Sequence, residues 1–74
     1  MKTTYTKKDA NHCEATIKAV ACHWSDEPCT YVGKIEYRDH GVLLFTTDTM
    51  IYRLHEEDAL NDAVAILKYD GMWV

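Results

Sequence analysis

Residues 30–46, with the sequence TYVGKIEYRDHGVLLFT, decide how this chain can fold. Every second position of the first half can face a core, and these positions are Tyr31, Gly33, Ile35 and Tyr37. The residues that follow each of them are Val32, Lys34, Glu36 and Arg38, and because three of these four are charged, the pattern predicts a half-buried strand over 30–38. Residues 39–41, Asp-His-Gly, favour a tight turn, and the apolar run 42–46 predicts a second, central strand. The two strands make a β-hairpin.

A third strand is predicted directly after this hairpin. Residues 47–49, Thr-Asp-Thr, indicate a short turn, and residues 50–54, Met-Ile-Tyr-Arg-Leu, have the composition of a strand. The region 30–54 is therefore expected to form a three-stranded antiparallel meander.

The clearest helix signal follows the strands. Three carboxylates, Glu56, Glu57 and Asp58, stand where a helix would begin, and acidic side chains in a first turn complement the helix dipole. An apolar stripe at helical spacing comes next, made of Leu60, Ala63, Val64 and Leu67. Gly71 closes the helix as a C-terminal glycine does, and residues 72–74, Met-Trp-Val, remain as an apolar tail that could form a short C-terminal strand.

The segment 9–24 is open to two interpretations. Small or apolar residues recur at intervals of three and four, at Ala10, Cys13, Ile17, Val20, Ala21 and Trp24. With Asp9 as N-cap and residues 25–28, Ser-Asp-Glu-Pro, as its end, this period predicts a helix over 9–24. The alternative is a strand through residues 16–22, because Ile17, Ala19 and Ala21 also alternate with other residues.

The predicted fold class is α+β: helix, three-stranded antiparallel meander, helix, with both helices on one face of the sheet. The expected core consists of Ile17, Val20, Ile35, Tyr37, Leu44, Tyr52, Leu54 and Leu67. In outline this order resembles the double-stranded RNA-binding domain. That family grips phosphates with lysines at the start of its second helix, where this chain has Glu56, Glu57 and Asp58. The resemblance is one of topology and implies no function.

Length and charge limit the class of protein. Seventy-four residues allow one core, so we expect a basic N-terminal arm at 1–8, with Lys2, Lys7 and Lys8, and a single α+β domain at 9–74. The domain has twelve acids against five Lys or Arg, or about −7, which repels phosphate backbones. A nucleic-acid partner is therefore expected only through the arm. No apolar run reaches the roughly 18 residues of a membrane span, so we expect a cytoplasmic protein without a membrane partner.

Cysteine and histidine residues suggest one alternative function. Three cysteines without an export signal fit reduced thiols in a cytosol. Cys22, His23 and Cys29 could converge at the end of the predicted helix and make a metal- or thiol-responsive regulator. A fourth ligand and a CxxC spacing are missing, so no metal or other cofactor is expected. The sequence also has no nucleotide-binding glycine loop and no nucleophile elbow, and we predict that the protein is not an enzyme.

The leading hypothesis is a small acidic interaction module. Carboxylates of the last helix could dock on the basic surface of a larger host protein and modulate it, most simply by inhibition, as small proteins of phages and mobile elements do. Trp24 is expected in the core, while Trp73 can either pack on the sheet or anchor the partner. A homodimer is also possible, through the strand at 30–38 or the tail. The predicted partner-binding residues are Glu56, Glu57, Asp58, Asp62 and Trp73.

Overall fold

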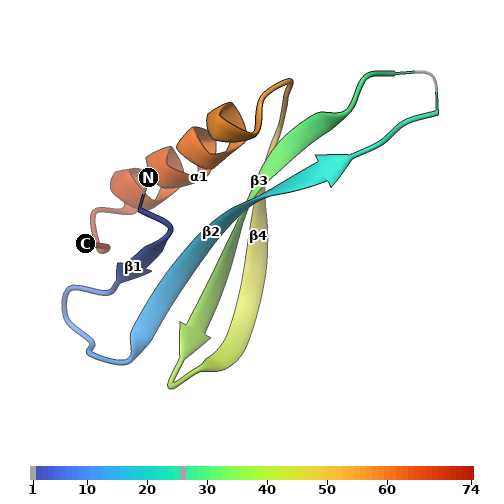
Figure 1. Cartoon of the computed structure of the whole chain (residues 1–74). Coiled ribbons are helices and arrows are strands. Elements are labelled where there is room, and N and C mark those ends of the chain that lie inside the picture. The colour runs from blue at the N-terminus through green and yellow to red at the C-terminus, as the bar shows by residue number, and fades with distance from the viewer. Residues whose placement is uncertain (1, 26) are drawn as a thin grey trace.

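The computed structural model describes residues 2–25 and 27–74, and four strands precede a single helix. The elements are β1 (Thr4–Thr6), β2 (Cys13–Cys22), β3 (Thr30–Asp39), β4 (Val42–Arg53) and α1 (Glu56–Asp70). Each strand pairs antiparallel with the next, so the sheet order β1-β2-β3-β4 is a simple meander. Figure 1 shows α1 lying along one side of this sheet.

The helix predicted over 9–24 is wrong, and with it the arrangement of two helices around a three-stranded meander. Residues 13–22 form β2, which pairs with β3 along its whole length, from Cys13 opposite Asp39 to Cys22 opposite Thr30. The alternative, a strand at 16–22, lies within β2 and agrees with the structure. The small and apolar residues of this segment fit both a three- and four-residue spacing and a two-residue alternation. The hydrogen-bonded ladder to β3 selects the strand, as tertiary context commonly does. Because the first helix is absent, the likeness to the double-stranded RNA-binding domain disappears too.

The turn predicted at 47–49 is also absent, because 42–53 form one strand instead of two. The β-branched Thr47 and Thr49 continue the extended backbone, and Asp48 lies opposite Lys34 in the ladder to β3. The pairing becomes irregular between Val32 and Lys34, where Met50 adopts a positive φ of 61°. The sequence signal for a turn therefore corresponds to a bulge that bends β4 without ending it.

The C-terminal helix and the strand before the hairpin are confirmed. β3 covers the predicted 30–38, and α1 begins at Glu56 and ends before Gly71, which adopts the left-handed conformation with φ 70°. The backbone amide of Gly71 donates a hydrogen bond to the carbonyl oxygen of Lys68. The stripe of α1 meets the sheet in a cluster of fully buried residues, which are Ala15, Ile17, Ile35, Ala63 and Leu67.

Three residues of the expected core are not in it. Leu44, Tyr52 and Leu54 are 58%, 51% and 63% exposed, because one helix covers β2 and β3 and leaves much of β4 bare. Ile17, Ile35 and Leu67 are buried as expected, and Val20 and Tyr37 are partly buried. Trp24 was expected in the core but is 57% exposed, since the loop between β2 and β3 carries it beyond the helix.

The N-terminal segment and the C-terminal tail meet at the β1 side of the sheet. Thr6 and Val74 exchange two backbone hydrogen bonds, of 3.1 and 2.9 Å, and Lys7 forms an isolated antiparallel bridge with Trp73. Residues 4–6 of the expected basic arm thus belong to the sheet as β1, and the ammonium group of Lys2 lies 4.9 Å from the centre of the Tyr5 ring. Among the described residues, no helix is long and apolar enough to cross a membrane.

Candidate protein interface

Three exposed carboxylates of α1 gather at the start of the helix. Glu56, Glu57 and Asp58 occupy the first turn of the helix, and Leu54, which is 63% exposed, lies just before them. No ion pair within residues 2–25 and 27–74 involves these three carboxylates. We call Leu54, Glu56, Glu57 and Asp58 the acidic end. It combines charge with one bare apolar side chain, which is the composition of an interface rim.

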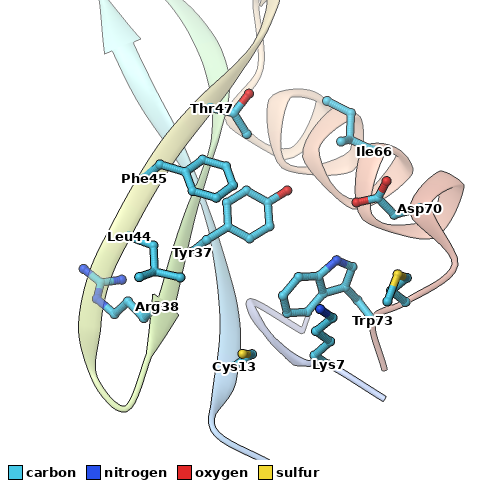
Figure 2. A pocket seen from close by; sticks show the side chains of 11 residues that line it. Lys7, Cys13, Tyr37, Arg38, Leu44, Phe45, Thr47, Ile66, Asp70 and Trp73 are labelled. Atoms are coloured by element: carbon cyan, nitrogen blue, oxygen red, sulfur yellow. The ribbon is translucent and has the colours of Figure 1, made fainter. Parts of the chain in front are cut away.

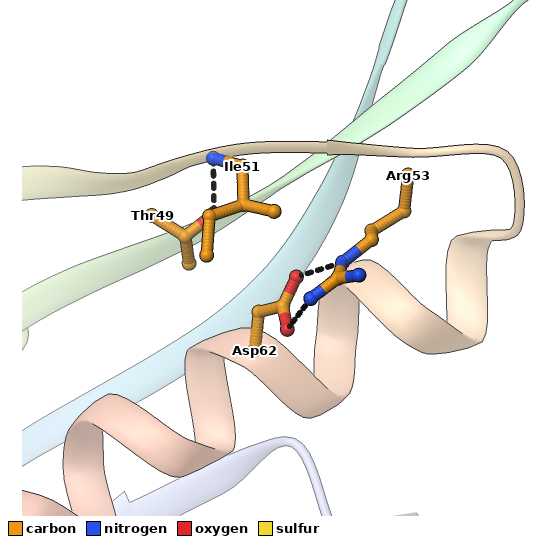
Figure 3. Close-up of polar contacts among 4 residues, drawn as sticks. All are labelled: Thr49, Ile51, Arg53 and Asp62. Carbon is orange, nitrogen blue, oxygen red and sulfur yellow. Dashed lines mark hydrogen bonds and ion pairs between the residues drawn. The ribbon is translucent and has the colours of Figure 1, made fainter.

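Asp62 was predicted to belong to the same binding face, but its carboxylate is bound by another side chain of the same molecule. It accepts two hydrogen bonds from the Arg53 guanidinium, from Nε at 2.7 Å and from Nη2 at 3.0 Å (Figure 3). This bidentate pair, with help from the nearby Asp58, raises the pKa of Arg53. Asp62 therefore ties α1 to the end of β4, and only 16% of its side chain is exposed.

Trp73, the fifth predicted binding residue, lies at the other end of α1. The helix has 15 residues, so about 22 Å of helix separates Trp73 from the acidic end. The Trp73 ring is tilted by 50° against Tyr37 at 5.5 Å, and Tyr37 stacks on Phe45 at 4.6 Å. Burial raises the pKa of the Tyr37 hydroxyl, and the carboxylate of Asp70 raises it further. The predicted set thus falls into two separate places.

A groove of about 510 Å³ opens beside this aromatic cluster, between β4 and the end of α1. Figure 2 shows Tyr37 and Phe45 on the strand side and Trp73 and Ile66 on the helix side. Lys7, Arg38 and Asp70 also line it. A second hollow of about 300 Å³ continues along the helix past Ile66 and Asp70, which line both. The volume is that of a small-molecule site, but the long open shape also suits the side chains of another protein.

The groove is bordered by large apolar side chains that face solvent. They are Leu44, Phe45, Ile51, Ile66, Tyr69 and Met72, which we call the β4 groove. Tyr69 is 93% exposed and Phe45 is 57% exposed. Sequence reasoning missed this surface because the apolar run 42–46 was interpreted as a central strand. The same pattern also fits an edge strand whose partner lies outside the chain.

No known family model, curated protein or solved structure matches this chain.

The cysteine and histidine residues do not assemble into a metal-binding group in the described part of the chain, where no three His, Cys, Asp or Glu side chains are placed so that they could hold a metal ion. Cys22 and Cys29 sit on either side of the loop between β2 and β3, and each thiol lies near a backbone carbonyl. At the opposite end of β2, His12 stacks on His40 with ring centres 4.2 Å apart, and His40 contacts Asp39 at 2.9 Å. These are local contacts between neighbouring turns.

Cys29 lies beside a tyrosine whose ionisation it affects. The charge and hydrogen bonding of the Cys29 thiol are the largest causes that raise the pKa of Tyr31, with smaller contributions from burial and from Glu56. Arg53, just before the acidic end, lies opposite Tyr31 at the start of β3, which follows the β2–β3 loop. This loop also carries the exposed Trp24.

Proposed function

We propose that this protein is a non-enzymatic interaction module that binds and modulates a larger host protein with a basic surface. The observation that carries the proposal is the acidic end, where Glu56, Glu57 and Asp58 are exposed beside the bare side chain of Leu54. Within the described residues, three other acids have ion-pair partners, namely Glu36, Asp39 and Asp62. The acidic end differs in having three consecutive exposed acids without such a partner in the described part of the chain, and this local concentration of charge can attract an external one.

The charges of the acidic end should raise the rate of association with the host protein more than they raise the affinity. Clustered surface charge steers a complementary partner and raises the association rate, and salt weakens this effect over a Debye length of about 8 Å at physiological ionic strength. Leu54 supplies apolar area to hold the complex once it has formed. Occupying a basic surface on the host protein would block whatever acidic ligand that surface normally binds, which is the simplest form of inhibition.

A capture experiment tests the proposal. The tagged protein should retain a stoichiometric partner from host lysate at low salt, and the double variant Glu56→Lys/Glu57→Lys should lose it. The matched control is Asp9→Lys/Glu14→Lys, which makes the same change in net charge at the other end of the sheet. In the sheet, Glu14 lies opposite Arg38 near the end of β3. Arg53, just before α1, lies opposite Tyr31 near the start of β3.

Two results would contradict the proposal. One is that the wild-type protein captures no stoichiometric partner at low salt. The other is that both double variants weaken capture equally, since net charge and not the acidic end would then be responsible.

A further inference from the structure

One edge of the sheet is partly covered, because β1 pairs with β2 at Glu14, Ala15 and Thr16, and the other edge is bare. On the β1 side, residues 72–74 pair with residues 6–8 through backbone hydrogen bonds. β3 is paired on both sides, so the dimer edge predicted at 30–38 is wrong. Within the part of the chain that the structure describes, β4 pairs only with β3 and is an edge strand of 12 residues. Its ladder to β3 is irregular at Leu44 and around Met50, and the Ile51 amide donates a hydrogen bond to the Thr49 hydroxyl. A long, apolar free edge is a template for another strand.

The amount of exposed surface points in the same direction. The chain exposes 5060 Å², whereas a compact monomer of 8.5 kDa is expected to expose about 4,700 Å². A standard dimer removes about 800 Å² from each copy. Seven hydrophobic residues are buried and thirteen large ones are exposed, of which seven belong to β4. Burying β4 in a dimer of standard size would therefore remove the excess of exposed area over that of a compact monomer.

We propose that β4 pairs antiparallel with β4 of a second copy, about a twofold axis at Thr47, to form a continuous eight-stranded sheet. This inference goes beyond the proposed function, because it assigns β4 to a second copy and leaves host binding to the acidic end. A twofold interface uses the same surface on both copies, so one strand must match itself when its direction is reversed. β4 meets that condition.

The register follows from the two faces of the strand. Phe45 and Thr47 lie opposite Tyr37 and Ile35 on the helix side, so Thr46 and Asp48 face the other side. Opposite residues of an antiparallel pair point to the same face, which requires the axis to pass through a residue position and not between two.

Centring on Asp48 would place two carboxylates opposite each other, and centring on Thr46 would place Leu44 opposite Asp48. Centring on Thr47 instead places Asp48 opposite the hydroxyl of Thr46 and Phe45 opposite Thr49, in the part of β4 between its two irregular positions, Leu44 and Met50.

This pairing also covers the β4 groove. The twofold axis stands perpendicular to the sheet, so both α1 helices lie on the same side and flank a shared trough above the two β4 strands. Ile66 and Tyr69 of each copy then border the apolar side chains of the other. The charges that line the groove are mixed, with Lys7 and Arg38 against Asp62 and Asp70. A strongly charged peptide gains nothing from such a lining, whereas a second copy adds matching apolar area.

Sedimentation equilibrium over about 1–200 μM tests the dimer. The wild-type chain should reach twice 8.5 kDa within this range. Leu44→Lys should weaken association at least tenfold, because it buries two ammonium groups in the interface. Trp24→Lys is the matched control, since Trp24 and Leu44 are 57% and 58% exposed and Trp24 lies in the distant β2–β3 loop. A monomer at every concentration, or equal weakening by both variants, overturns the proposal.

Disulfide trapping tests the register independently of stability. Thr47→Cys should give an oxidised dimer well above the wild-type background, because residues directly opposite have Cα atoms about 4.5–5.5 Å apart, within the range a disulfide spans. Thr49→Cys is the control on the same face of the same strand. In the proposed register Thr49 lies opposite Phe45, so two Thr49 positions are too far apart to bridge. Equal trapping of both variants, or none of Thr47→Cys, overturns the register.

Discussion

The backbone carbonyl oxygen of Ala59 on α1 lies directly against Gly33 on β3, so closely that a Cβ atom at position 33 would overlap it. The methyl group Cγ2 of Thr49 would be only 2.9 Å from the same Cβ atom. The helix therefore approaches the sheet backbone at the one position of β3 that has no side chain. This contact sets the height of α1 above the sheet and, through it, the position of the acidic end.

Gly33→Ala should destabilise the fold by about 1–3 kcal/mol, because helix and sheet must move apart to admit the methyl group. Both neighbouring groups are constrained, one being backbone and the other a β-branched side chain. Urea unfolding of the variant and the wild type measures the difference. An unchanged free energy of unfolding would show that α1 is not seated on Gly33.

Leu67→Ala should cost about 2–5 kcal/mol, because Leu67 is 1% exposed and its removal leaves a cavity in the core. Leu54→Ala makes the same chemical change at a residue that is 63% exposed, and should alter the free energy of unfolding by less than about 0.5 kcal/mol. Chemical denaturation of both variants compares them directly. Similar losses would contradict the placement of Leu54 outside the core.

The Arg53–Asp62 pair should contribute modestly to stability, because 45% of the Arg53 side chain is exposed to solvent. A double-mutant cycle with Arg53→Gln and Asp62→Asn should give a coupling free energy of about 0.2–1 kcal/mol. The coupling should decrease in high salt. A coupling near zero at low salt would show that this bidentate contact does not hold α1 to β4 in solution.

Glu36 should make stability depend on acid pH. Its hydrogen bond with Lys18, whose Nζ lies 3.2 Å from Oε1, and the charges of Lys18 and Arg38 hold its pKa below the ordinary 4.5, against an opposing effect of burial. The folded pKa is depressed, so this stabilisation is complete above pH 4.5 and is lost as the pH falls through the folded value.

Thermal unfolding of the wild type and of Glu36→Gln from pH 7 to pH 3 measures this contribution. The difference between the two proteins should be largest near neutral pH and shrink in acid. A difference that grows as the pH falls would contradict the predicted sign.

Local signals in the sequence were sufficient for some elements. β3 was predicted from its alternation, and α1 from its apolar stripe, acidic first turn and closing glycine. Both predictions rest on residues that are close together in the sequence. The acidic end could be seen for the same reason, because Glu56, Glu57 and Asp58 are adjacent. The separation of Asp62 and Trp73 from it could not, because it depends on Arg53 and Tyr37, which are distant in sequence.

The sequence by itself determined that a helix begins near Glu56 and that a strand runs from Thr30 into a hairpin at His40-Gly41. Only the tertiary structure decided that residues 13–22 are a strand and that β4 is a bare edge. A segment such as CEATIKAVAC satisfies both helical and strand periods. The hydrogen-bonding partner that selects the strand is β3, which lies outside the segment and begins only at Thr30. Whether an apolar strand is central or at an edge likewise depends on how many neighbours fold against it, and no local pattern of side chains contains that number.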